Sequence, residues 1–326
     1  MNEPRYTKDA IDSLKSQRVI KSFELPKLKS NLSPFRYPGG KGKLSKFLAV
    51  FLASNDLKGT KFVEPFCGGA GGSLPLLEAG VISKLVLNDA NPFIAEFWHA
   101  AINNTKVLSK EIRKVNVNLE TWHKYKAIFE GSVDASDIEK ALSVFFLNRT
   151  NRSGILHAGP IGGQAQNGEY LIDCRFNKDN LIERVENIAK FKRKTIVTNE
   201  DASSLVFKLK QSNCFIYADP PYVKEGKNIY KKYCFNDHQH TTFANAIKHQ
   251  KNPWLISYDD APLVHELYAK SGINVIELSY VMNKAKVGRE LLIASSNLNM
   301  PNLNSQVENI SDSFTLTKSI IAVNEN

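Results

Sequence analysis

A short apolar segment that stops at an acid and two prolines constrains the fold of this chain most strongly. Residues 215–218 read as a buried strand, and the tetrapeptide Asp219–Tyr222 follows it directly. Proline cannot donate to a sheet ladder and fixes its own φ angle, so the strand ends at Asp219 and the chain stiffens there. In an open α/β sheet, ligands bind at the carboxyl ends of the strands. The segment therefore predicts an α/β fold with a ligand site at this strand end.

The tetrapeptide carries the acceptors that are needed to orient an amine. An exocyclic amine of a nucleobase is a poor nucleophile, because its lone pair is delocalised into the ring. The Asp219 carboxylate and the free carbonyl of Pro220 can accept from both N–H groups of one amine and leave its lone pair directed at an electrophile. Pro221 keeps the turn rigid, and Tyr222 can stack on the base. The alternative is a Pro-Pro turn in which Asp219 only caps the local backbone.

Length and charge limit the classes of protein that fit. The chain has 326 residues, enough for one large α/β domain with an insertion or for two domains. Its formal net charge of +10 favours a polyanionic partner. The longest apolar run, residues 44–53, is too short to cross a membrane, and no apolar segment follows the amino terminus as it does in a secretion signal. We therefore expect a cytoplasmic protein with no membrane partner.

The cysteines and histidines do not have the spacing of a metal site. No Cys-x-x-Cys pair occurs, so we expect reduced thiols at the four positions Cys67, Cys174, Cys214 and Cys234. His238 and His240 are close together, but no further ligand completes the set, which favours a solvated loop. No metal is predicted.

A glycine-rich loop between two strands indicates a nucleoside-binding unit. The strand at 62–64 leads into the loop 67–72, and the strand at 85–87 ends just before Asp89. Asp89 follows Gly68 at the spacing of about 20 residues at which an acid reaches both ribose hydroxyls. This unit alone does not separate a nicotinamide cofactor from S-adenosylmethionine. The absence of Gly-x-Gly-x-x-Gly and the position of Glu64, which can meet an amino group, favour S-adenosylmethionine. The alternative for Asp89 is an N-cap of the following helix.

A Gly-Gly turn at 39–40 precedes an apolar helix that begins near Leu44. Tyr37 and Lys41 therefore lie at the helix entrance, where backbone N–H groups favour an anionic group. The Walker spacing is not met. The alternative is a surface turn with solvated lysines.

Four motifs, taken in order, resemble the Dam-like family of N6-adenine DNA methyltransferases. They are Tyr-Pro-Gly-Gly-Lys at 37–41, Glu-Pro-Phe-Cys-Gly-Gly-Ala-Gly-Gly-Ser at 64–73, Asn-Asp-Ala-Asn at 88–91 and Asp-Pro-Pro-Tyr at 219–222. The resemblance covers about residues 33–295. It implies a doubly wound, Rossmann-like α/β methyltransferase sheet with an inserted, mainly helical target-recognition domain. It also implies methyl transfer from S-adenosylmethionine to N6 of an adenine flipped out of double-stranded DNA, with Asp219–Tyr222 as the catalytic motif.

The resemblance further implies a set of cofactor contacts. Asp201 follows a strand at 195–198 and is expected to meet the cofactor's adenine, its alternative role being a helix N-cap. The full set of expected cofactor-binding residues is Tyr37, Lys41, Glu64, Phe66, Gly68, Asp89 and Asp201.

The segment between the two halves of the core is expected to recognise DNA. Arginines there can reach phosphates or guanine edges, and an amide at Asn148 or Asn151 can reach an adenine edge. Lysines after Tyr222 are expected to close on the flipped nucleotide and its phosphates. The expected DNA contacts are Asn148, Arg149, Arg152, Arg175, Lys224, Lys227 and Lys231, each with ordinary loop polarity as the alternative. The loop at 159–164 differs from the Asn- and Phe-rich hairpin of many members, so no target sequence is carried over.

The prediction for the whole chain has four parts. Residues 1–30 form an extension, 31–100 with 195–296 the catalytic domain, 101–194 the target-recognition domain, and 297–326 a loosely docked tail. We expect a monomer or weak dimer that acts on double-stranded DNA. Its setting is a restriction–modification system, with a cognate endonuclease as partner, or an orphan or phage-encoded enzyme of a bacterium. The alternatives are the same chemistry on cytosine N4 or on RNA, an inactive nucleic-acid-binding relative, and a nicotinamide oxidoreductase.

Overall fold

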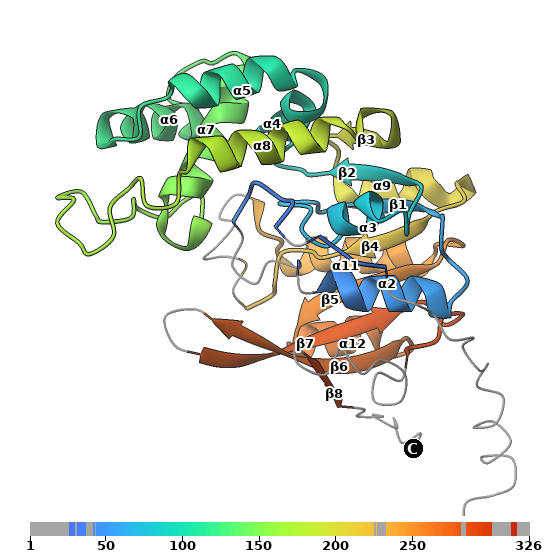
Figure 1. Cartoon of the computed structure of the whole chain (residues 1–326). Helices are drawn as coiled ribbons and strands as arrows, with labels where there is room; N and C mark the ends of the chain where they lie inside the picture. Colours follow the sequence, from blue (N-terminus) through green and yellow to red (C-terminus); the bar gives the residue numbers. More distant parts are fainter. Residues whose placement is uncertain are drawn as a thin grey trace, which may run out of the picture.

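A single mixed sheet carries the fold. The computed structural model describes residues 26–29, 31–36, 42, 44–224, 226, 233–281, 285–301 and 314–317. Within this part, eight strands pair in the order β3-β2-β1-β4-β5-β7-β6-β8, and helices lie on both sides of them (Figure 1). The strands are β1 (Lys61–Glu64), β2 (Lys84–Asn88), β3 (Thr195–Thr198), β4 (Phe215–Ala218), β5 (Trp254–Asp259), β6 (Gly272–Val281), β7 (Ala285–Ala294) and β8 (Phe314–Thr317).

The strand order reverses in the middle of the sheet. Strands β3, β2, β1, β4 and β5 are parallel neighbours, whereas β7 is antiparallel to β5 and β6, and β8 is antiparallel to β6. The chain runs outward from β1 to β3 and then returns to β4 on the other side of β1. In sheets of this kind the ligand crevice lies at the point of reversal. The predicted doubly wound α/β fold is confirmed.

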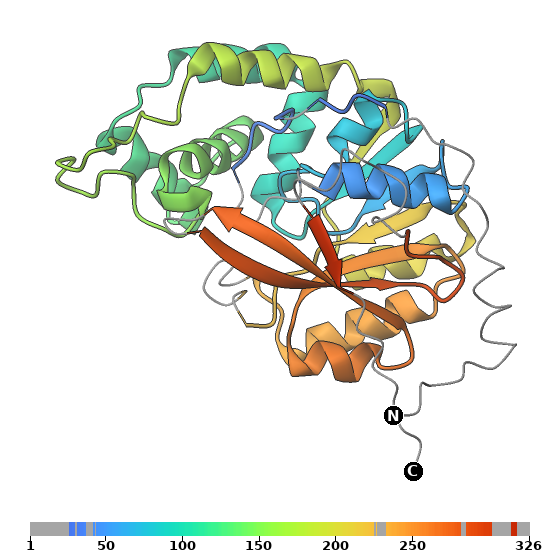
Figure 2. The same cartoon turned by 60° about the horizontal axis from the view of Figure 1, so that its bottom comes forward.

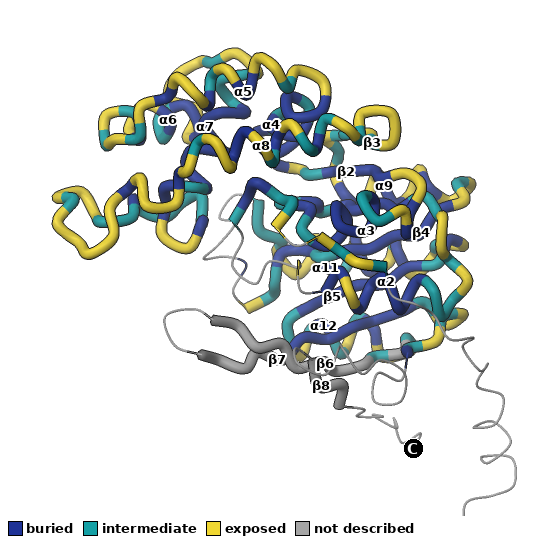
Figure 3. Tube along the Cα trace, in the orientation of Figure 1, coloured by how far each residue is buried: buried dark blue, intermediate teal, exposed yellow. Residues whose placement is uncertain are grey.

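Helices cover both faces of the sheet, because the strands are apolar on both sides. Phe62 packs into one buried cluster and its neighbour Val63 into another, and Phe215 and Ile216 alternate in the same way. Figure 3 shows the buried positions concentrated along the central strands. One face carries α2 (Leu44–Ser54), α3 (Leu74–Glu78) and α4 (Pro92–Asn103), and the other α9 (Ala202–Lys208), α11 (Asp237–Lys248) and α12 (Pro262–Tyr268).

A bundle of helices follows α4. It consists of α5 (Thr105–Lys114), α6 (Leu119–Glu130), α7 (Asp137–Thr150) and α8 (Lys178–Ala189), which lie together beside the sheet (Figures 1 and 2). Short 3-10 turns occur at η2 (Arg152–Gly154), η3 (Lys192–Lys194) and η4 (Leu209–Gln211). The insertion is thus mainly helical, as expected.

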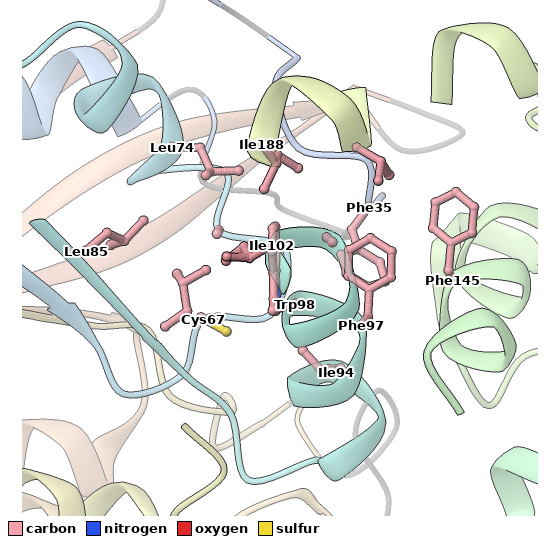
Figure 4. Close-up of a cluster of buried hydrophobic side chains, with 14 of the residues drawn as sticks. Phe35, Cys67, Leu74, Leu85, Ile94, Phe97, Trp98, Ile102, Phe145 and Ile188 are labelled. Atoms are coloured by element: carbon pink, nitrogen blue, oxygen red, sulfur yellow. The ribbon is translucent and has the colours of Figure 1, made fainter. Parts of the chain in front are cut away.

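The helical region shares its hydrophobic core with the sheet. The ring of Phe97 in α4 stacks on Phe145 in α7 with centroids 5.4 Å apart, and Phe35 packs edge-on against Phe97 at 4.4 Å. Figure 4 shows these rings with Trp98 and Ile188 in one cluster that also contains Leu85 of β2. The boundary at 101–194 stays a prediction, because no separate core marks it.

One local expectation is wrong, and the loose docking of the tail at 297–326 stays a prediction. Where the tail is described, the Asn299 amide donates to Asn55 Oδ1 at 2.8 Å, and β8 pairs with β6. His238 and His240 lie in helix α11 rather than in a loop, and His240 is buried with Nδ1 2.7 Å from the Tyr258 hydroxyl.

Four further expectations concern the cysteines, a metal site, a membrane-spanning helix and the extension at 1–30. All four cysteines are free thiols. Among the described residues, no three His, Cys, Asp or Glu side chains gather as a metal site would need. Nor does that part of the chain contain a helix with the length and apolarity to span a membrane. The extension at 1–30 lies almost entirely outside the described residues.

Candidate active site

Three predicted acids come together where the parallel strands end. Glu64 is the last residue of β1, Asp89 follows β2 and Asp219 follows β4, and all three line one cavity of about 520 Å³. Four further predicted residues line the same cavity: Phe66, Gly68, Pro221 and Tyr222. Side chains up to about 155 residues apart in the sequence therefore meet because β1, β2 and β4 are adjacent parallel strands.

Glu64 is a buried acid that faces the cavity. Its side chain is only 4% exposed, and the Ser73 hydroxyl donates to Glu64 Oε2 at 2.7 Å. Burial raises the pKa of Glu64 to about 8, the Ser73 hydrogen bond opposes this, and the charge of Asp219 adds to it. A cation placed next to Glu64 would stabilise its charged form. This end of the cavity therefore suits a positively charged ligand.

Asp89 closes the glycine-rich loop onto β2. The Gly68 amide donates to Asp89 Oδ2 at 3.0 Å, and the Asn91 amide donates to Oδ1 at 2.9 Å. Burial raises the pKa of Asp89 to about 6, although both hydrogen bonds lower it. Gly68 has a φ of 44°, which a residue with a side chain adopts only with strain. Asn91 is the N-cap of α4, so the alternative role of Asp89 as that N-cap is wrong.

Asp219 is held from the neighbouring strand β5. The buried Ser257 hydroxyl donates to Asp219 Oδ1 at 2.9 Å, and its oxygen lies 3.0 Å from the Tyr217 hydroxyl. The backbone after Tyr222 is also fixed, since Asp259 accepts from the Val223 and Lys224 amides at 2.9 Å each. The turn is therefore rigid for reasons beyond its two prolines, Pro220 being buried and Pro221 facing the cavity.

Two residues that contact the catalytic turn were missed in the sequence. Ser257 contacts Asp219, and Glu290 in β7 accepts a hydrogen bond from the Tyr222 hydroxyl. A usable signal existed for Glu290, because it is an acid that immediately precedes the apolar run at 291–294. Ser257 offers no such signal.

Four arginines also line the cavity: Arg36, Arg149, Arg175 and Arg184. Arg149 donates to the carbonyl of Arg175 at 2.9 Å, and Arg184 donates to the carbonyl of Ser33 at 3.0 Å. Burial, and then the charges of the other three, lower the pKa of Arg149 to about 9. Within the described residues none of the four forms an ion pair with an acid. This arginine cluster is a ready site for an anion, and Arg36 and Arg184 were not predicted.

The two asparagines expected to read an adenine are instead structural. Asn148 is fully buried; its Oδ1 accepts from the Arg36 amide at 2.6 Å, and its Nδ2 donates to the carbonyls of Arg36 and Gly154. Asn151, also buried, accepts from the Trp122 indole at 2.6 Å and donates to two backbone carbonyls. Both side chains are fully buried, and both N–H groups of each amide already donate to backbone carbonyls, so neither amide can donate to a base and the predicted DNA contact of both is wrong.

The remaining predicted residues are scattered. Arg152 is exposed outside the cavity wall, and the Lys224 ammonium donates to the Asp260 carbonyl. Asp201 accepts from the Ser204 amide at 2.8 Å and caps α9, which confirms its alternative role as an N-cap. Tyr37, Lys41, Lys227 and Lys231 lie outside the described residues.

Comparison with known proteins identifies the family. The sequence model of the D12 class N6 adenine-specific DNA methyltransferases matches residues 37–283, which include all three acids of the cavity. The Type II methyltransferase M.MjaIII of Methanocaldococcus jannaschii is 24% identical over 226 residues, covering 63% of this chain and 76% of that protein. The resemblance to the Dam-like family is confirmed. Because the match spans most of the sequence and contains the cavity, this chain belongs to the D12 class N6 adenine-specific DNA methyltransferase family.

Proposed function

We propose that this protein transfers the methyl group of S-adenosylmethionine to N6 of an adenine flipped out of double-stranded DNA. The observation that carries the proposal is the position of Asp219. Its carboxylate is held by Ser257 and lines the same cavity as Glu64 and Asp89. Flipping is required because the amine of a stacked adenine cannot reach a cavity inside the protein.

The residues present fit this cofactor. When bound, S-adenosylmethionine supplies a methyl group on a positively charged sulfur. Glu64 is buried, and a cation beside it would favour its ionised form, so it suits the ammonium group of the cofactor. Asp89 holds the loop with one lone pair of each oxygen and keeps others for ribose hydroxyls. Gly68 and Phe66 complete the wall against which the cofactor would lie.

The catalytic turn then orients the target amine. Asp219 and the Pro220 carbonyl accept from its two N–H groups, which frees the lone pair for direct, in-line attack. Tyr222 lines the cavity and stacks on the adenine ring. No covalent bond between protein and DNA is needed in this scheme.

The positive charge of the chain supports DNA as the substrate. The formal net charge is +10, and the arginine cluster adjoins the catalytic turn in one cavity. We assign the cluster, with Arg152 and Lys224 at the surface, to DNA phosphates. The name of the archaeal relative supports a restriction–modification setting with a cognate endonuclease, and an orphan or phage enzyme of a bacterial cytoplasm is the alternative.

Modification mapping tests the proposed function. The chain is expressed in a host free of DNA methylation, beside an Asp219→Ala control, and the DNA is read by long-read sequencing. We expect N6-methyladenine at one short motif with the wild type only, while D219A still binds S-adenosylmethionine. N4-methylcytosine, modified RNA alone, or full activity of D219A would contradict the proposal.

A further inference from the structure

We propose that Glu290 is a positioning residue that fixes the ring of Tyr222 against the target adenine. The inference rests on the proposed function of the cavity and extends it to a strand that the sequence motifs leave out. It assigns a role to the buried acid of β7.

The strand pairing places Glu290 at the edge of the sheet where the parallel strands end. Glu290 lies opposite Asp259, the last residue of β5, and opposite Ile276 of β6, so it is paired on both sides. Strand β7 is antiparallel to β5, and Glu290 is its first residue that pairs with β5, at the end where the parallel strands stop. The backbone position of Glu290 is thus fixed by two strands at the same sheet edge as Asp219.

The side chain of Glu290 makes a specific contact in a buried setting. It is 1% exposed, and the three residues that follow it, 291–293, are fully buried and apolar. Its Oε1 accepts a hydrogen bond from the Tyr222 hydroxyl. Burying an acid disfavours folding unless the acid is hydrogen-bonded. A buried acid among apolar residues is therefore a feature that proteins typically keep at functional sites.

The contact acts on the end of the ring farthest from the backbone. Asp259 already holds the backbone amides of Val223 and Lys224, so the ring of Tyr222 keeps only its side-chain rotations. A hydrogen bond at the hydroxyl restrains the rotation about χ1, which swings the axis of the ring, and so fixes where the ring lies for a base to stack on it. Rotation about χ2 leaves the hydroxyl in place and is not restrained by this bond. Neighbouring β5 and β7 residues thereby hold both the main chain and the ring before DNA arrives, which is preorganisation of the stacking surface.

The test compares Tyr222→Phe, Glu290→Met, Glu290→Gln and the double variant Y222F/E290M. Single-turnover methylation is measured on a duplex containing the site mapped for the wild type, and 2-aminopurine at the target position reports base flipping. We expect Y222F and E290M each to slow methylation by about tenfold and to change the 2-aminopurine signal, with S-adenosylmethionine affinity unchanged. E290Q keeps an acceptor and should restore most of the rate.

The double variant and a control make the result specific. If the two side chains act through one hydrogen bond, Y222F/E290M should be no slower than the slower single variant. Glu266→Gln, an exposed acid on α12, is the matched control and should behave as wild type. Unchanged kinetics of Y222F, which removes only the hydroxyl, would overturn the inference, as would additive losses. A wild type that methylates no DNA would instead refute the proposed function.

Discussion

Glu64 gives the protein a stability that depends on pH. Burial raises the pKa of Glu64 from 4.5 to about 8, so the folded chain keeps a proton that the unfolded chain releases between these values. Unfolding therefore becomes easier as the pH rises through this window. Relative to Glu64→Gln, which does not titrate, ligand-free wild type should lose on the order of 2 kcal/mol of unfolding free energy between about pH 6 and pH 8.

Denaturant unfolding of both variants at the two pH values measures this difference. Glu266→Gln on α12 is the control for loss of an exposed acid and should follow the wild type. If wild type and E64Q differ by the same amount at both pH values, Glu64 does not hold a proton in the folded state.

Single residues also show where sequence reasoning stops. Glu64, Asp89 and Asp219 could be placed in one cavity, because each follows an apolar strand and parallel strands end at a common edge. The structural role of Asn148 could not be predicted, because the neighbouring sequence does not show which way its amide points. In the structure the amide bonds to the backbone of Arg36 rather than facing DNA. Orientation of a side chain on α7 depends on packing against a segment more than 100 residues away.

At the scale of elements, the arginine cluster is built from four separate pieces of chain. The segment 31–36, helix α7, the loop before α8 and α8 itself each bring one guanidinium to the same wall. Their mutual repulsion is relieved when an anion binds between them. Arg36 is the best probe, because its buried Nη1 has no hydrogen-bond partner among the described residues and its pKa is lowered by burial and by Arg175.

Arg36→Gln should therefore weaken DNA binding and lower the salt dependence of that binding by about one counterion. Fluorescence anisotropy over a range of salt concentrations measures both quantities. Lys27→Gln, which removes an exposed charge from residues 26–29, is the matched control. A loss of S-adenosylmethionine affinity with an unchanged salt slope would assign the cluster to the cofactor's carboxylate instead of a phosphate.

The elements also divide into those that the sequence predicts and those that it does not. Strands β1, β4 and β5 are apolar on both faces and were recognisable, whereas α11 begins with the polar run at 236–242 and has little apolar periodicity. The contact between Tyr222 and Glu290 spans 68 residues. It depends on the register of β5 with β7, which no local pattern encodes.

At the scale of the whole molecule, the helical region and the sheet should unfold together. Phe145 of α7 lies in the same buried cluster as Phe97 of α4 and Phe215 of β4, so the helical region shares the core on this face of the sheet. Phe145→Ala should lower the unfolding free energy by about 3–5 kcal/mol, because it opens a cavity among fully buried rings. Exposed Phe207→Ala on α9, 63% accessible, should change it little and serves as control.

Hydrogen exchange followed by mass spectrometry distinguishes one cooperative unit from two. In F145A, amides of α7 and α8 and amides of β1 and β4 should lose protection by the same factor, since opening either part exposes the shared core. Faster exchange confined to α5–α8 would show that the helical region unfolds alone. The boundary at 101–194 would then be that of an independent target-recognition domain, despite the rings of Phe35, Phe97 and Phe145 that join it to the sheet.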